Sequence, residues 1–218
     1  MYTSVEFWDR VAASYATRGV MDGAAYETTL ERTRHHLYHL SPSARVLELG
    51  CGTGATALRL CDAVTGYVAS DASSGMMEQA RARKAQADAP NLSLMHAGLG
   101  DDALGQAGPF DVVLAFNLLH LLPDLRAGLG QVRALLKPGG MFISKTICPK
   151  GASMPLLYRG AFLVFPLLQR WGKLPPGFRK LAVAELDAEI IRAGFEIIET
   201  GNYPARPPSH FVVAQRGA

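Results

Sequence analysis

A short apolar segment that runs directly into glycines restricts the possible folds more than any other part of the chain. Residues 46–54 read VLELGCGTG, so Gly50, Gly52 and Gly54 stand at alternate positions, and a helix-like segment follows them. Glycine lets the backbone turn sharply and lets a ligand approach main-chain N–H groups closely. This order of strand, glycine turn and helix therefore predicts a ligand site at the turn.

A carboxylate follows this turn at a distance that suits a ribose contact. Asp71 lies 21 residues after Gly50, at the end of the next expected strand, where it could accept both hydrogen bonds of a ribose diol. The pattern of Gly50, Gly52 and Ala55 also satisfies the dinucleotide motif G-x-G-x-x-G/A, so the turn alone leaves the cofactor open. Glu48 argues against a dinucleotide, because an acid here opposes a pyrophosphate but suits a cofactor that carries an ammonium and a sulfonium.

Strand-like and helix-like segments alternate along most of the chain, which predicts an α/β fold with a parallel sheet. We expect helices over 4–17, 24–40, 54–62, 73–86, 123–136 and 183–193, and strands over 45–49, 65–70, 92–96, 110–116 and 141–147. Ser73 is expected to cap its helix, residues 137–140 (KPGG) to separate a helix from a strand, and Gly194 to end the last helix. Residues 195–200 and 211–214 are expected to form a closing antiparallel pair.

Length predicts one domain over residues 1–218. The expected N-terminal helices would form a cap over 1–42, and the irregular, proline-interrupted stretch over 148–182 would be a lid-like insert. An apolar fraction of 49% with a net charge of +3 excludes a disordered chain and does not by itself indicate a nucleic-acid partner. The three cysteines, Cys51, Cys61 and Cys148, lack paired spacing, so we expect reduced thiols and no metal site. We see no signal peptide and no apolar run long enough for a membrane span, which favours a cytoplasmic protein.

Four motifs in this order and spacing resemble those of class I S-adenosylmethionine (SAM)-dependent methyltransferases that act on small molecules. They are residues 46–54, 70–77 (SDASSGMM), 110–120 (FDVVLAFNLLH) and 135–140 (LLKPGG). The resemblance implies a three-layer, doubly wound, Rossmann-like fold whose seven-stranded sheet is mostly parallel with an antiparallel C-terminal strand. It also implies SAM as the cofactor and S-adenosyl-L-homocysteine (SAH) as its product.

The same resemblance assigns residues to the cofactor. The glycine turn and Glu48 would face the methionine part of SAM, and Asp71 would hold the ribose hydroxyls. Adenine would pack on Ala72 and Met76. The implied cofactor set comprises Glu48, Gly50, Cys51, Gly52, Gly54, Asp71, Ala72, Met76, Gly98, Leu99, Asn117 and Leu118.

Two parts of this set lie at the ends of the third and fourth expected strands. Asn117 and Leu118, at the end of the fourth strand, would lie near the methionyl carboxylate and the transferred methyl group. The family often has Gly-Asp after the third strand, whereas residues 98–102 here read GLGDD. Either Asp101 replaces that acid, or the backbone of Gly98 and Leu99 holds adenine together with apolar packing; we expect the second.

Methyl transfer from a sulfonium is an in-line displacement, which needs a positioned acceptor and, where the nucleophile must lose a proton, a base. His120, four residues after the fourth strand, is the expected base, although a packed helix residue is the alternative. Tyr15 and Tyr26 in the N-terminal helices, and Tyr158 and Arg159 in the insert, are the expected acceptor contacts. For the two helix tyrosines, aromatic packing within an amphipathic helix is the alternative.

Basic and apolar residues mix in the insert, which gives a hint about the substrate. Residues 125–184 contain ten Lys or Arg and no Asp or Glu. This pattern allows a lid over a hydrophobic, anionic small molecule, a weak contact with an anionic membrane surface, or a solvated basic face; nucleic acid is not expected. The expected function is methyl transfer to a small hydrophobic acceptor such as a phenol, quinone, thiol or amine. An NAD-dependent oxidoreductase and a non-catalytic SAM-binding protein remain as alternatives.

Overall fold

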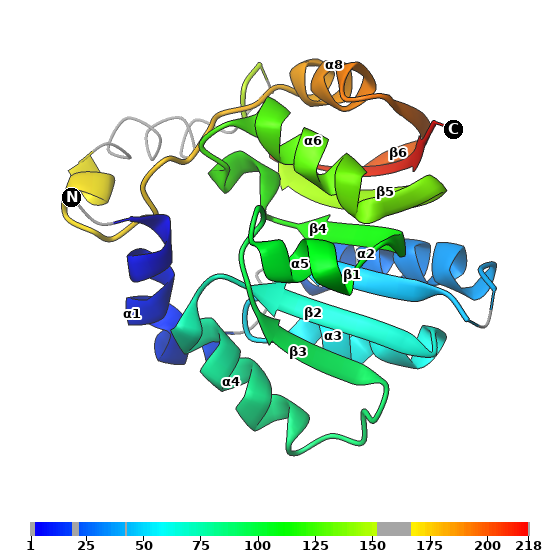
Figure 1. Ribbon diagram of the computed structural model, residues 1–218. Coiled ribbons are helices and arrows are strands. Elements are labelled where there is room, and N and C mark those ends of the chain that lie inside the picture. Colours follow the sequence, from blue (N-terminus) through cyan, green and yellow to red (C-terminus); the bar gives the residue numbers. More distant parts are fainter. Residues whose placement is uncertain (1–2, 19–21, 42, 152–166, 218) are drawn as a thin grey trace.

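A single sheet of seven strands forms the centre of the molecule (Figure 1). The computed structural model describes residues 3–18, 22–41, 43–151 and 167–217, so Tyr158 and Arg159 lie outside the described residues. The strands are β1 (Arg45–Leu49), β2 (Gly66–Asp71), β3 (Leu92–His96), β4 (Phe110–Phe116), β5 (Leu136–Ile147), β6 (Phe195–Ala205) and β7 (Pro208–Arg216). Their order across the sheet is β3-β2-β1-β4-β5-β7-β6, and β7 is antiparallel to both of its neighbours. The predicted fold class is confirmed.

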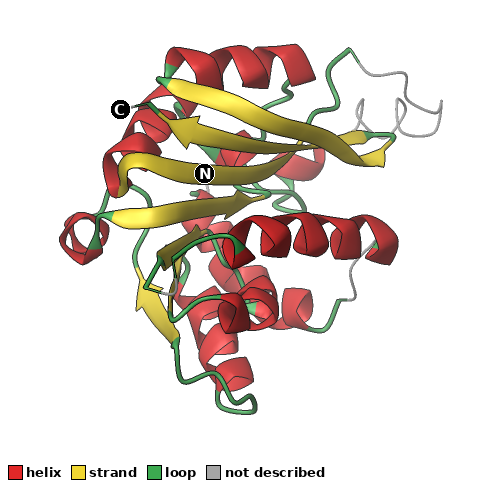
Figure 2. Cartoon of the chain, turned by 90° about the vertical axis from the view of Figure 1, so that its right-hand side faces the viewer, coloured by secondary structure: helices red, strands yellow, loops and turns green. Residues whose placement is uncertain are grey.

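Helices cover both faces of this sheet (Figures 1 and 2). One face carries α2 (Gly23–Tyr38), α3 (Ala55–Leu60) with the 3₁₀ turn η1 (Cys61–Ala63), and α4 (Ser74–Lys84). The other carries α5 (Asp102–Ala107), α6 (Leu125–Leu135) and α8 (Val183–Arg192). Helix α1 (Ser4–Ala16) and the 3₁₀ turn η2 (Leu119–Leu121) lie at the edge where the parallel strands end. Within the described ranges, no helix has the length and apolar character needed to cross a bilayer.

The two faces of the sheet bury two hydrophobic clusters that share the central strands. On β4, Val112 and Leu114 face the cluster under α2, α3 and α4, whereas Val113 and Ala115 face the cluster under α5, α6 and α8. All four side chains are fully buried. A parallel strand covered by helices on both sides is apolar at nearly every position, and Asp111 is the one charged residue in this strand, which explains why the segment was recognisable as a buried strand.

The helix before residues 137–140 ends at Leu135 as expected, but the strand expected from residue 141 already begins at Leu136 and runs through these residues. Gly140 explains how a strand tolerates them: a Cβ there would lie 2.8 Å from the Lys137 carbonyl and 3.1 Å from the Asp111 carbonyl. Only glycine permits this close approach of two backbones. Lys137 and Asp111 also form an ion pair of 2.8 Å across the same irregularity, so the segment remains attached to the sheet.

Candidate active site

The glycine turn after β1 has a backbone that requires glycine at three positions. Gly50, Gly52 and Gly54 have φ angles of +65°, +53° and +73°, in the left-handed region that other residues avoid. The N–H of Cys51 donates to the Ser70 carbonyl at 2.9 Å, which joins the turn to β2. Gly54 then serves as the N-cap of α3. The three glycines and the bond to β2 therefore define the shape of this turn.

Two apolar side chains flank this turn and leave room for a ligand. A Cβ added at Gly52 would meet only the sulfur of Met76, at 4.0 Å, so the turn is open at this residue. A Cβ at Gly50 would lie 3.0 Å from Leu118, which brings the end of β4 to the turn. Four of the predicted cofactor residues thus lie together at one place.

Asp71 lies at the end of β2 beside the same turn. Its carboxylate accepts hydrogen bonds from the N–H groups of Gly52, at 2.9 Å, and Ser73, at 2.8 Å. Burial raises the pKa of Asp71, while these two bonds act in the opposite direction. A carboxylate held by backbone bonds has a fixed orientation, and each of its oxygens retains a further lone pair for a ligand hydroxyl. These features fit a carboxylate that binds ribose.

The loop after β3 lies against the residue that follows Asp71. A Cβ at Gly98 would lie 3.0 Å from the Cβ of Ala72, so the two backbones are in close contact. The carboxylate of Asp101 accepts the N–H of Gly98 at 2.6 Å and is therefore engaged within its own loop. Leu99 is half-buried and packs against the cluster under α5, α6 and α8.

Glu48 is buried beneath the turn, on the sheet face that α2 and α3 cover. Its carboxyl accepts a hydrogen bond of 2.8 Å from the Tyr67 hydroxyl. Burial raises the pKa of Glu48 to about 8, so the group is mostly protonated at neutral pH. Tyr26 of α2 also reaches this region and shares a hydrogen bond of 3.1 Å with Thr56 at the start of α3. The buried thiol of Cys51 completes this lining, and burial raises its pKa.

The end of β4 carries the one left-handed residue other than glycine in the described part of the chain. Asn117 has a φ of +56°, and its N–H donates to the Lys145 carbonyl of β5 at 2.7 Å. Strained residues of this kind concentrate at functional sites. Leu118 follows at once, so this turn connects β5 to the glycine turn.

His120 follows in η2 and is buried at 7% exposure. Its ring lies 4.8 Å from the ring of Phe178, between centroids, and its carbonyl accepts the N–H of Arg179 at 2.8 Å. Residues 178–179 of the insert therefore pack directly on η2. Nδ1 of His120 is buried and makes no hydrogen bond with any described residue. Burial lowers the pKa of His120 to about 4, which keeps the ring neutral.

Helix α1 is held at this edge by a residue that the sequence analysis missed. Asp9 accepts hydrogen bonds from the Ser73 hydroxyl at 2.6 Å, the Gly75 N–H at 2.9 Å and the Ser74 hydroxyl at 3.2 Å. Tyr15, on the same helix, is 43% exposed and packs edge-on against Trp8, with 5.6 Å between ring centroids. This contact fits the alternative of aromatic packing within the helix.

A second group of residues that the sequence analysis missed lies near the C-terminal end of β5. Ser144, Lys145 and Thr146 are all buried, and the two hydroxyls have no partner among the residues that the structure describes. The run MFISKTI places these three polar residues next to one another, so it has no period-two alternation that could have marked them as buried. Asp9 gave no signal either, because nothing in sequence links it to a helix that begins some 65 residues later.

The comparisons with known proteins fit this site. Residues 47–142 match a family model described as a methyltransferase domain. Over 133 residues, or 56% of the chain, the sequence is 35% identical to the highly reducing polyketide synthase ACTTS3 of Alternaria alternata. This match covers 5% of the synthase, and the chain spans a similarly small part of the other curated relatives that it matches.

Solved structures of methyltransferases have the same fold. The CurJ carbon methyltransferase aligns with a TM-score of 0.68 at 22% identity, over 90% of this chain and 56% of the other. The trans-methyltransferase CalH, solved in complex with SAH, aligns with a TM-score of 0.65 at 26% identity, over 85% and 55%. The fold, the turn with Asp71 and these matches together define a class of protein. Residues 47–142 are a methyltransferase domain, and the matches support a SAM-dependent enzyme of class I with SAM as its cofactor.

Proposed function

We propose that this protein transfers the methyl group of SAM to a small hydrophobic acceptor, with His120 as the base. The observation that supports it is the buried ring of His120, whose Nδ1 has no partner among the described residues. A buried polar atom without a partner is costly, about 1–3 kcal/mol, so it is retained where a ligand supplies the partner. The ring is neutral and so has a lone pair for a proton, and negative charge on a bound acceptor would raise its lowered pKa toward the working pH.

The residues around the glycine turn would divide the cofactor among them. Asp71 would hold the ribose hydroxyls, Ala72 and Met76 would pack on adenine, and the turn itself would present backbone N–H groups. Asn117 and Leu118 would border the methionine part. When bound, SAM supplies a methyl group on a sulfonium, whose departure needs no acid from the protein. The remaining task of the chain is to orient the acceptor and to remove its proton.

The relatives suggest which acceptor to test first. One is named a carbon methyltransferase, and several are polyketide synthases. We therefore propose a carbon next to a carbonyl as the first accepting atom, ahead of the phenols, quinones, thiols and amines that the sequence also allows. Such a carbon needs a base before it can accept a methyl group, which agrees with the position of His120.

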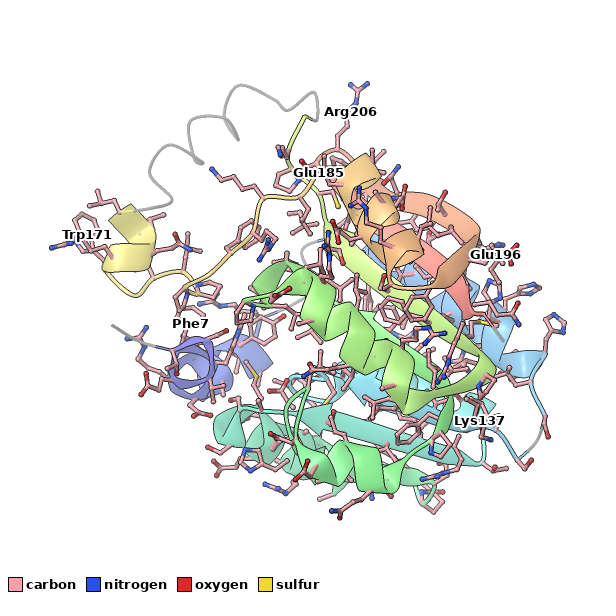
Figure 3. The ribbon with its side chains drawn as sticks, turned by 45° about the horizontal axis from the view of Figure 1, so that its top comes forward. Phe7, Lys137, Trp171, Glu185, Glu196 and Arg206 are labelled. Carbon is pink, nitrogen blue, oxygen red and sulfur yellow. The ribbon has the colours of Figure 1, made fainter. Side chains whose placement is uncertain are left out.

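We further propose that residues 1–218 act as one domain, with a cap over 1–42 and a lid over 148–182. The packing of Phe178 and Arg179 on His120 supports a lid, because these residues cover the expected base. We also propose a weak membrane-surface contact through the same insert. Trp171 supports it, because this side chain is 62% exposed and points away from the body of the molecule in Figure 3. A small-molecule acceptor, and no nucleic acid, is the proposed partner.

The first experiment measures thermal stabilisation by SAM, SAH and NADH in the wild type and in Asp71→Ala. Ligand at 100 times its Kd stabilises by about 2.7 kcal/mol. We expect a shift with SAM and SAH that is much smaller in Asp71→Ala, and none with NADH. Glu78→Ala, which removes an exposed carboxylate on α4, should keep the full shift. A shift with NADH alone would favour the oxidoreductase.

Turnover is then tested with β-ketothioesters, phenols, thiols and amines. Methylation of the β-ketothioester at carbon, followed by mass spectrometry, is the expected result. Methylation at oxygen, nitrogen or sulfur alone would retain the methyltransferase and overturn the carbon acceptor. Cofactor binding without turnover on any class would favour the non-catalytic SAM-binding protein.

A further inference from the structure

Lys145 is a buried lysine at the edge of the site that the proposed mechanism does not use. It lies on β5 with 9% of its surface exposed, and its neighbours in register are Phe116 on β4 and Phe211 on β7. Across residues 3–18, 22–41, 43–151 and 167–217, its ammonium makes no hydrogen bond and no ion pair. The charge that acts on it most is Asp22, an exposed carboxylate whose oxygen caps the N–H of Ala25 at 3.0 Å.

A buried lysine whose ammonium has no partner among the described residues is a poor choice for stability alone. Burial penalises the charged form and lowers the pKa of Lys145, and Asp22 only partly offsets this effect. Between two phenylalanines, an unbranched apolar side chain such as methionine would fill the space without that penalty. The chain therefore carries a cation at a place where packing does not require one.

Lys145 lies where we expect the acceptor to bind, next to the turn after β4 but away from the strands that carry the glycine turn and Asp71. Its carbonyl accepts the N–H of Asn117, so it adjoins the turn that contains Leu118. In the sheet, however, β4 lies between β5 and β1, and the glycine turn follows β1. Neighbouring strands are about 4.8 Å apart, so β5 is roughly 10 Å across the sheet from β1. Asp71 and Ala72 lie further away still, after β2 on the other side of β1.

We propose that Lys145 binds an anionic oxygen of the acceptor, either a carboxylate or the oxyanion formed when the acceptor loses its proton. This inference rests on the proposed function, since it names the chemistry of the acceptor at the same site. An ammonium on a mostly buried side chain, with Phe116 and Phe211 as its neighbours in register, attracts a negative oxygen more strongly than it would in water. It would also stabilise negative charge that develops on the acceptor, as preorganised cations do in other active sites.

The test measures ligand binding and needs no turnover. The protein is saturated with SAH and titrated calorimetrically with 3-phenylpropanoate and with its neutral match, 3-phenylpropanamide. We expect the wild type to bind the carboxylate about tenfold more tightly than the amide. Lys145→Met should bind both equally, and Lys145→Arg should retain the preference. Lys150→Met is the matched control, because Lys150 lies at the start of the insert but is paired with Glu185 and should not contribute.

Two results would overturn the proposal. The first is a wild type without a carboxylate preference, which includes a protein that binds neither fragment. The second is a preference that survives in Lys145→Met. If that variant also loses affinity for SAH, the ammonium is assigned to the carboxylate of the cofactor. SAH affinity and unfolding temperature also report whether each variant folds, and Lys145→Gln replaces the methionine variant if it does not.

The binding test separates this proposal from the proposed function. A chain that never methylates an acceptor, yet loses its carboxylate preference in Lys145→Met, would refute the function and leave the anion site in place. Where turnover is found, a second arm compares the oxyanion with the fixed carboxylate. Loss of kcat in Lys145→Met on an uncharged β-ketothioester indicates the oxyanion, whereas a rise of KM confined to acidic acceptors indicates the carboxylate.

Discussion

Glu48 gives the clearest case in which one residue changes the chemistry of the site. Its position two residues before the glycine turn favoured a cofactor with positive charge, and the structure adds that burial raises the pKa of the carboxyl to about 8. A mostly neutral carboxyl beneath the turn avoids the cost of a buried charge while no cofactor is bound. A bound cation would favour ionisation, so binding of SAM would be coupled to the release of a proton.

This raised pKa makes the stability of the cofactor-free protein depend on pH. The carboxyl has a pKa near 4.5 in the unfolded chain and about 8 in the folded protein. Between pH 4.5 and pH 8, the folded state therefore keeps a proton that the unfolded state has lost. Stability is therefore highest below about pH 4.5 as far as Glu48 contributes, and falls by a few kcal/mol as pH rises to 8. We expect Glu48→Gln, which keeps the acceptor for Tyr67, to remove this fall. Urea unfolding of both proteins between pH 5 and 8 measures the difference.

The control for this prediction is Glu196→Gln. Glu196 is exposed on β6 and lies at the surface in Figure 3, so its loss should not alter the pH dependence. Parallel stability curves for the wild type and Glu48→Gln would contradict the prediction, because they would mean that Glu48 titrates alike in both states.

His120 allows a kinetic prediction at the same scale. If it is the base, His120→Asn should lower kcat by roughly 10²- to 10⁴-fold while the Kd for SAM stays the same. With a pKa of about 4, the ring is neutral from pH 6 to 8, so the wild-type rate should not fall on the acidic side until well below pH 6. Steady-state kinetics and calorimetry measure the two quantities. The control is His39→Asn, because His39 is exposed and lies just beyond the end of α2. An unchanged kcat in His120→Asn would show that His120 is not the base.

The residues that the sequence could predict are those tied to the local backbone. Gly50, Gly52 and Gly54 require positive φ angles, and Asp71 sits at a strand end, so each leaves a pattern within a few positions. Asp9 and Lys145 leave none of this kind. Asp9 depends on a helix far along the chain, and the isolation of Lys145 depends on which strands flank it, which only the assembled sheet determines.

At the scale of elements, the contact between α1 and α4 links the N-terminal helix to the cofactor residues. Gly75 allows this contact, since a Cβ there would lie 2.8 Å from the Asp9 carbonyl oxygen. The carboxylate of Asp9 then reaches Ser73, Ser74 and Gly75 at the start of α4. Asp71 and Ala72 come just before this helix, so the position of α1 and the shape of the ribose and adenine segment are connected.

We expect Asp9→Ala to loosen α1 and to weaken SAM binding. Hydrogen bonds to a charged group contribute about 1.5–3 kcal/mol each when buried, but the exposure of this site reduces the total to about 1–3 kcal/mol. Hydrogen exchange monitored by mass spectrometry should show faster exchange across residues 4–16, together with a several-fold higher Kd for SAM. Glu78→Ala removes a solvent-exposed carboxylate from α4 and should change neither. Unaltered exchange in α1 would show that Asp9 does not hold the helix.

Elements were predictable where hydrophobic pattern and length agreed. The strands at 45–49, 92–96 and 110–116 begin and end as expected, and Ser73 caps α4 by accepting the N–H of Met76 at 3.1 Å. Helix α5 was missed because residues 102–107 are short and contain Gly105, which weakens a helical pattern. The start of β5 was placed too late because KPGG is a helix breaker in isolation, whereas here the neighbouring strand β4 accommodates it.

At the scale of the whole molecule, the sheet joins parts of the chain that are distant in sequence. The last two strands, β6 and β7, complete the edge of β5, and Phe211 and Val212 contribute to opposite core clusters. The N-terminal helix is tied to the insert as well as to α4, because Arg10 donates to the Gly172 carbonyl at 2.5 Å. Buried residues of α2, β6 and β7 belong to the two clusters that they share with the central strands, so we expect the chain to unfold as one unit.

The two tryptophans make this expectation testable. Trp8 lies on α1 and Trp171 lies in the insert, so Trp171→Phe leaves a single reporter of the cap. Its fluorescence should change at the same temperature as the circular dichroism at 222 nm, because loss of the sheet removes the surface on which α1 packs. SAM at 100 times its Kd should raise both transitions by the same amount, about 5–10 °C. A fluorescence transition below the dichroism transition, or one that SAM does not move, would mean that the cap melts independently of the cofactor site.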